Sequence, residues 1–123
     1  MSDAPVLRAV RGAITVDVDT ADAVDEGTAL LLREMLERNE LGPGEIVSII
    51  FTATPDLTSE FPAVAARAMG LSAVPLLCAR EIPVEGAMPR CVRVMMHCYC
   101  PPEREIRHVY LREARQLRTD LPE

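Results

Sequence analysis

One long helical segment between two strand-like runs limits the folds that this chain can adopt. Over residues 20–39, apolar side chains such as Leu31 and Met35 recur at helical spacing, behind a threonine that can cap the first turn. Residues 7–16 are rich in β-branched and small side chains, and residues 45–53 form an almost continuously apolar run of the kind buried on both faces. This order of strand, helix and strand predicts a right-handed crossover unit.

The rest of the chain supplies further strands and one short helix. Residues 62–69 favour a short helix that ends at a glycine, and residues 74–80 and 91–99 have the pattern of a third and a fourth strand. The run RHVYL at residues 107–111 can pair as a final strand. We therefore expect one domain over residues 1–123, of class α+β, with a mixed sheet of about five strands packed on one long and one short helix.

The composition narrows the possible partners. The chain has 123 residues and a net charge of -6, and all of its 13 basic residues are arginines. This charge repels phosphate and argues against nucleic acid or an anionic membrane as a partner, so an anionic ligand would need a local arginine cluster. No run is apolar enough for a membrane span, and the N-terminus lacks the pattern of a secretion signal, so we expect a cytoplasmic protein.

Four cysteines and two histidines raise the question of a metal or disulfide site. A cytoplasmic location keeps thiols reduced, which argues against disulfides. Cys98 and Cys100, between His97 and His108, have one intervening residue, whereas zinc knuckles use two to four, so structural cysteines are favoured over metal ligands. Cys78 as a nucleophile would need a base beside it, and the sequence places neither histidine there. These patterns therefore favour structural cysteines over a metal site or a catalytic thiol.

Three isolated charges interrupt the apolar strands. Arg11 lies in the first strand, Glu81 follows the third and Arg93 lies inside the fourth. A buried charge is costly without a partner, so each residue could face outward at an edge or form an internal ion pair. Their position on three separate strands favours another interpretation, in which they converge on one polar pocket whose guanidinium groups bind a ligand carrying carboxylates.

The C-terminal tail offers a weaker signal. Its arginines are interleaved with glutamates, a pattern that predicts a solvated face, and Tyr110 could be an ordinary strand residue at the boundary of the core. The arginines concerned are Arg104, Arg107, Arg112, Arg115 and Arg118.

Four stretches carry these residues: VRGAITVDVDT, TATPDLTSEFPAVAAR, VPLLCAREIPVEGAMPRCVRVMM and IRHVYLREARQLRTDL. In this order and at these separations, they resemble the monofunctional chorismate mutases of the AroH class. The match runs from Arg11 to Leu121, and its most diagnostic part is the C-x-x-E of Cys78 and Glu81, followed by CVRVMM and then RHVYL. The resemblance implies a homotrimer, built as a pseudo-barrel, whose active sites lie at subunit interfaces.

The implied reaction is the intramolecular Claisen rearrangement of chorismate to prephenate, on the way to phenylalanine and tyrosine. Such an isomerase needs no covalent catalysis, metal or cofactor. By the resemblance, Arg93 would place its guanidinium at the ether oxygen, where negative charge grows in the transition state. Glu81 would accept a hydrogen bond from the ring hydroxyl with Cys78 assisting, and Arg11 and Tyr110 would hold a carboxylate. The other implied substrate-binding residues are an apolar wall of Phe61, Ala63 and Leu76, a backbone contact at Leu77, and Arg67 and Leu117 at the pocket mouth.

The chain departs from the family pattern at two positions. Val64 stands where that pattern has lysine, and Leu77 stands where it has threonine, so one charge and one hydroxyl are missing and affinity for the dianion could be lower. Two other classes remain open from the residues. A RidA-like trimeric imine deaminase would also place an arginine in an intersubunit cleft, and a noncatalytic module for small anions would bind without turnover.

Overall fold

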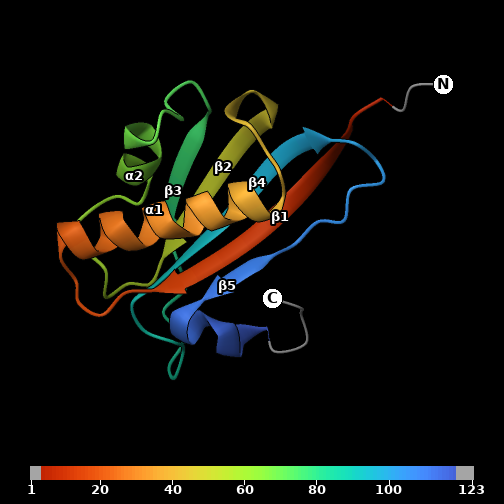
Figure 1. Ribbon diagram of the computed structural model, residues 1–123. Helices are drawn as coiled ribbons and strands as arrows, with labels where there is room; N and C mark the ends of the chain where they lie inside the picture. The colour runs from red at the N-terminus through yellow and green to blue at the C-terminus, as the bar shows by residue number, and fades with distance from the viewer. Residues whose placement is uncertain (1–3, 119–123) are drawn as a thin grey trace.

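A mixed five-stranded sheet with two α-helices forms the framework of the fold (Figure 1). The computed structural model describes residues 4–118, so Leu121 and both ends of the expected domain lie outside the described part. The predicted strands and helices are confirmed, with ends shifted by one or two residues. Their bounds are β1 Val6–Thr15, α1 Ala21–Arg38, the 3₁₀ helix η1 Pro43–Glu45, β2 Ile46–Ala53, α2 Ala63–Ala68, β3 Leu76–Arg80, β4 Cys91–Cys100, β5 Val109–Leu111 and the 3₁₀ helix η2 Arg112–Leu117.

The strand order is β3-β2-β4-β1-β5. The central strand β4 is antiparallel to both β1 and β2, while β3 is parallel to β2 and β5 is parallel to β1. The strands β1 and β2, which α1 connects, therefore run parallel to each other with β4 inserted between them. In this order β1 lies between β4 and β5.

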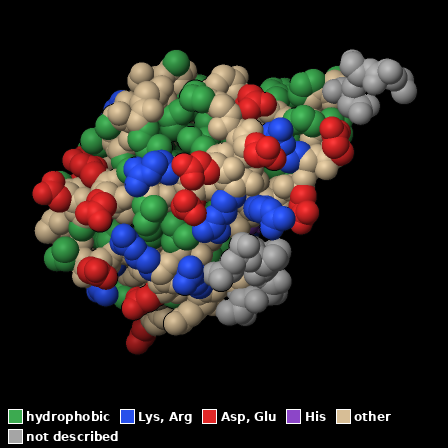
Figure 2. Space-filling view, viewed as in Figure 1, with side chains coloured by type: hydrophobic (Ala, Val, Ile, Leu, Met, Phe, Trp, Pro, Cys, Tyr) green, Lys and Arg blue, Asp and Glu red, His purple; other side chains and the backbone are tan. Residues whose placement is uncertain are grey.

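Helix α1 forms where the periodicity predicts it. The hydroxyl of Thr20 accepts a hydrogen bond from the Ala23 N–H at 3.1 Å, which satisfies one of the free donors of the first turn. Leu31 and Met35 are fully buried against the sheet. The helix approaches β1 so closely that a Cβ on Gly12 would lie 2.6 Å from the Met35 Sδ, which explains a glycine inside a strand. Figure 2 shows acidic and basic side chains interspersed over this side of the molecule.

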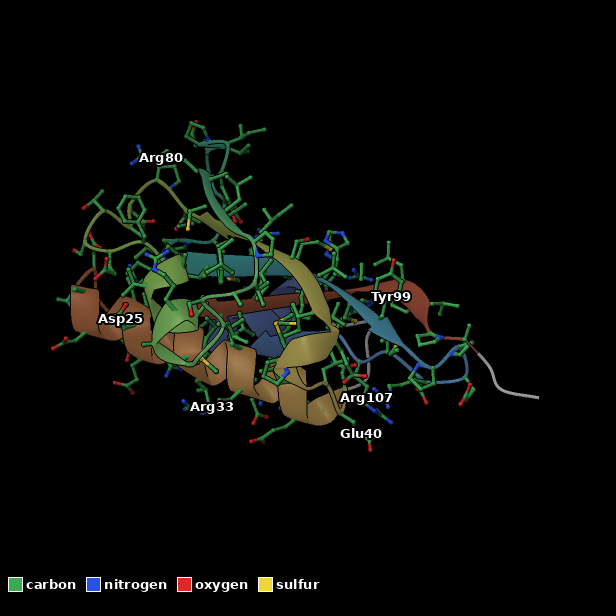
Figure 3. The ribbon with its side chains drawn as sticks, turned by 90° about the horizontal axis from the view of Figure 1, so that it is seen from above. Asp25, Arg33, Glu40, Arg80, Tyr99 and Arg107 are labelled. Carbon is green, nitrogen blue, oxygen red and sulfur yellow. The ribbon has the colours of Figure 1, made fainter. Side chains whose placement is uncertain are left out.

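The two faces of the sheet differ. Both α-helices lie on one side of it (Figure 3), and the β4 side chains that face them are buried: Val92, Val94, Met96 and Cys98. We call the opposite side the open face. On it, within residues 4–118, η2 covers one small cluster that includes Ala13, Cys91 and Tyr110. Leu7, Leu77 and Tyr99 remain 55%, 61% and 49% exposed there. The open face therefore carries exposed apolar side chains beside its polar ones.

Two arginines of the tail bind main-chain carbonyls. Arg104 is partly buried, which corrects the prediction of a solvated face for this residue, whereas Arg112 is exposed as predicted. Arg104 donates to the carbonyls of Asn39 and Glu40, at 3.1 Å each, and thereby closes the end of α1. Arg112 donates to the Thr15 carbonyl at 3.2 Å. Main-chain carbonyls that strands and helices leave unpaired are the acceptors in both cases, a role that the local sequence cannot reveal.

The cysteines are free thiols, as predicted, and Cys91, Cys98 and Cys100 are buried. Burial raises the pKa of the Cys91 and Cys98 thiols to about 11, so both stay protonated at neutral pH. Among residues 4–118, no three histidine, cysteine or acidic side chains are grouped so that they could hold a metal ion. Neither described helix is long and apolar enough to span a membrane.

Candidate active site

Three of the residues singled out in the sequence meet in one depression on the open face. Arg11 from β1, Arg93 from β4 and Tyr110 from β5 line a hollow of about 170 Å³. The sheet register explains the meeting, because Ala13 pairs with Arg93 on one side and with Tyr110 on the other, and Arg11 lies two residues before Ala13 on the same face. We call this group, together with Glu81, the arginine site.

Glu81 joins the arginine site through an ion pair. Its main-chain N–H donates to the Ala53 carbonyl at 3.0 Å, which extends the alignment of β3 with β2 by one residue. Its Oε2 lies 3.1 Å from the Arg93 Nε and accepts a hydrogen bond from the Thr52 hydroxyl at 2.7 Å. The internal ion pair that the sequence left open is therefore present, and it lies within the polar pocket rather than in place of it.

Thr52 was missed by the sequence reasoning. It pairs with Arg93 across the β2–β4 ladder, so both side chains point to the open face. The sequence predicted that residues 45–53 are buried on both faces, whereas several side chains of β2 are partly exposed. Only the pairing of β2 with β4 shows that Thr52 points toward Glu81.

The Glu81 carboxylate holds the Arg93 guanidinium in the site. The Nε of Arg93 is buried and lies 3.1 Å from the Glu81 Oε2, so this carboxylate is its charged partner. The Arg93 side chain is 37% exposed, so its exposed part lies elsewhere than at Nε. The arginine site therefore presents two guanidinium groups and a phenol to an oxygen-rich anion.

A second depression, of about 390 Å³, contains two other predicted residues. Phe61, 68% exposed, and Cys78 line it together with residues 57–60 and the end of β3. Cys78 pairs with Phe51, whose side chain is in the core, so the thiol points to the helix side of the sheet. We call this depression the Phe61 pocket.

Within one chain, the structure does not bring Cys78 to Glu81. Thr52, Glu81 and Arg93 share the open face, whereas Cys78 points to the opposite side. If Cys78 assists Glu81 at a substrate, the two residues have to come from different chains. The remaining predicted residues lie apart from both depressions: Ala63 is buried in the core, Leu76 packs against it, Leu77 is exposed on the open face, Arg67 is exposed on α2, and Leu117 packs beside Tyr110.

The loop that carries Phe61 is held by an aspartate. The Asp19 carboxylate accepts hydrogen bonds from the N–H and the hydroxyl of Thr58, at 3.0 and 2.8 Å, and from the Ser59 N–H at 3.1 Å. These bonds, led by that of the Thr58 hydroxyl, lower the pKa of Asp19. Asp56 similarly accepts the Arg90 N–H at 2.9 Å, which ties this loop to the segment before β4.

Comparison with known proteins supports the interpretation of the arginine site. The sequence model of the family described as chorismate mutase type I matches residues 7–121. The chain belongs to the type I, AroH-class chorismate mutases. It is 51% identical to chorismate mutase AroH of Thermus thermophilus over 118 residues, which are 94% of this chain and 97% of that protein. It is 41% identical to chorismate mutase AroH of Bacillus subtilis (strain 168), over 94% of this chain and 93% of the relative.

A solved structure agrees with the sequence relatives. The chorismate mutase from Clostridium thermocellum superimposes with a TM-score of 0.85 at 46% identity, over 89% of this chain and 98% of that chain. The chain therefore has the function of its family, and the family's enzymes are isomerases of aromatic amino-acid biosynthesis. The imine deaminase and the noncatalytic binding module find no support in these comparisons.

Proposed function

We propose that the protein rearranges chorismate to prephenate in the arginine site, in the biosynthesis of phenylalanine and tyrosine. The observation that supports this site is the convergence of Arg11, Arg93 and Tyr110 on one hollow, with Glu81 paired to Arg93 at its side. We further propose that residues 1–123 act as one domain. The cytoplasmic location expected from the sequence stays a prediction.

Arg93 supplies the main catalytic interaction. The C–O bond of the ether breaks ahead of C–C bond formation, so negative charge grows on the ether oxygen in the transition state. A guanidinium N–H that meets this oxygen binds the transition state more tightly than the ground state, which lowers the barrier. No proton, electron or covalent bond passes between enzyme and substrate.

The other residues orient the substrate. Arg11 and Tyr110 hold a carboxylate and favour the compact conformer in which the two reacting carbons meet. Glu81, whose Oε2 is occupied by Thr52 and Arg93, keeps its other oxygen for the ring hydroxyl and complements the positive character of the allylic fragment. The attraction for the dianion is local, which suits a chain with a net charge of -6.

We infer a homotrimer, arranged as a pseudo-barrel, with active sites between subunits. Two features support it: the exposed apolar side chains of the open face, and the position of the Phe61 pocket on the other side of the sheet from the arginine site. If the arginine site of one subunit faced the Phe61 pocket of the next, Cys78 and Phe61 could complete a cavity that excludes water. The residues that lie outside both depressions, Ala63, Leu76, Leu77, Arg67 and Leu117, stay predicted contributors to its wall and mouth.

The direct test adds chorismate to the purified protein and follows the loss of its ultraviolet absorbance, with prephenate identified by mass. Turnover without added metal or cofactor is expected. Binding of chorismate without turnover would contradict the proposed reaction. Light scattering tests the assembly, and an active, stable monomer would contradict the shared site.

Thr52 provides a sharper test of how Glu81 is held. Thr52→Val keeps the volume of the side chain but removes the hydroxyl that donates to Glu81. Because a hydrogen bond to a charged group contributes about 1.5–3 kcal/mol, kcat/KM should fall about tenfold or more. Thr52→Ser, which retains the donor, is the matched control and should recover most of the loss. Equal activity of the valine and serine variants would contradict this role.

A further inference from the structure

The imidazole of His108 contacts the main chain of Arg11. The Arg11 N–H donates to the His108 Nδ1 at 2.9 Å. We propose that His108 is a positioning residue: in its neutral form it fixes the main chain of Arg11 and thereby the guanidinium in the arginine site, and its protonation releases that hold. This inference rests on the proposed function for its effect on catalysis, but the contact itself does not.

The imidazole supplies an acceptor to a main-chain N–H that has no partner in β5. The parallel ladder between β1 and β5 begins at the pair Gly12–Val109. The N–H of Arg11, one residue earlier in β1, therefore lies beyond the end of β5. Without His108, this donor would face the β5 side of a half-buried region with no strand carbonyl to accept it. The imidazole takes the place of the missing carbonyl, and it comes from the residue that immediately precedes β5.

The direction of the hydrogen bond determines the protonation state of the ring. A nitrogen that accepts a hydrogen bond carries no proton, so the neutral ring holds its proton on Nε2. The protonated ring has N–H groups at both nitrogens and cannot accept from Arg11. The charged groups that face His108 are Arg8 and Arg11 from β1 and Arg118 after η2, all of them cationic.

The surroundings keep the ring neutral. Burial, followed by the charges of Arg11, Arg118 and Arg8, lowers the pKa of His108 below its usual value. A histidine whose pKa is lower in the folded state favours folding at pH values above its ordinary pKa. It loses that contribution as the pH falls through the folded-state value. The hydrogen bond from the Arg11 N–H to His108 is therefore present at neutral pH and is lost in acid.

The catalytic consequence should be a change in KM. Arg11 lines the same hollow as Arg93 and Tyr110, where it is proposed to hold a substrate carboxylate. That carboxylate carries the same charge in the ground state and in the transition state, so a displaced Arg11 weakens the binding of both and raises KM. The weaker preference for the compact conformer lowers kcat by a smaller factor. A purely structural loss would instead lower the amount of active enzyme and leave KM unchanged.

Two variants separate the roles. In His108→Leu the acceptor is gone, and we expect KM for chorismate to rise about tenfold with a smaller fall in kcat. In His108→Asn the side-chain oxygen can occupy the position of Nδ1 without titrating, so KM should stay near the original value. The unmodified enzyme should show KM rising as the pH falls through the His108 pKa, and the asparagine variant should not. An unchanged KM in the leucine variant, or equal impairment in both folded variants, would overturn the proposal.

A measurement without substrate tests the contact separately. The chain has two histidines, so ¹⁵N spectra of the imidazoles can be assigned by comparison with His108→Asn. The expected results are a proton on Nε2 at neutral pH and an Arg11 amide resonance that titrates together with His108. A proton on Nδ1 would overturn the proposal even if the leucine variant does not fold. If this contact is found but chorismate is not turned over, the proposed function fails and the contact stands.

Discussion

Arg93→Lys is expected to keep the fold and to lose about a hundred- to thousandfold of kcat, because one preorganised donor at a developing oxyanion contributes roughly that much. The ammonium keeps the charge but cannot reproduce the planar fork, which meets Glu81 at 3.1 Å through Nε and can bind the substrate through its other N–H groups. Initial rates at saturating chorismate measure the loss. Retention of most of kcat would refute the role assigned to this guanidinium.

A matched control is available on α1. Arg33 is exposed on the helix side of the sheet (Figure 3), remote from the arginine site. Arg33→Lys should leave kcat and KM unchanged, which shows that the substitution of arginine by lysine is not harmful by itself. Thermal unfolding of both variants should be close to that of the original protein, because neither substitution changes a buried apolar contact.

The second large effect is the rescue of activity by mixing two inactive variants. Phe61→Asp adds a carboxylate to an exposed position of the Phe61 pocket, and repulsion of the dianionic substrate should reduce kcat/KM by about a hundredfold. Arg93→Ala removes the donor from the arginine site. If each active site combines the arginine site of one subunit with the Phe61 pocket of another, mixed trimers contain some sites in which both halves are unaltered.

The composite site predicts how much activity the mixture recovers. Random exchange at equal concentrations leaves about a quarter of the sites with both halves intact, so activity should rise to about a quarter of that of the original enzyme. The mixture has to be unfolded and refolded together so that the subunits exchange. A mixture of Arg93→Ala with Glu81→Gln is the control, because both changes affect the same half and no rescue is expected. No recovery in the first mixture, with exchange verified by mass, would contradict the composite site.

Local patterns predicted most of the elements of this fold. The helix over residues 20–39 and the alternation of β4 follow from periodicity, which depends only on neighbouring residues in the chain. The alternation places Arg93 on one face and Val92 and Val94 on the other, as observed. The hydrogen bonds of Arg104 and Arg112 to main-chain carbonyls were not predictable, because their acceptors belong to residues far away in the sequence.

In the candidate site, too, some residues were predictable from the sequence and others were not. Arg11, Glu81, Arg93 and Tyr110 were identifiable because charges in apolar strands are costly and because the surrounding motifs resemble a known family. Thr52 was not identifiable, because a threonine in an apolar strand is ordinary until a carboxylate lies 2.7 Å from its hydroxyl.

The sequence by itself predicted the elements and the family, and it singled out the residues of the candidate site. Only the tertiary structure decided that β4 lies between β1 and β2, that Cys78 points away from Glu81, and that His108 accepts the main-chain N–H of Arg11. The physical reason is that side-chain direction within a strand has a local period of two, whereas the choice of neighbouring strands depends on contacts between distant parts of the chain. The sharing of the site between subunits was implied by the resemblance to the family, and the direction of Cys78 away from Glu81 supports it.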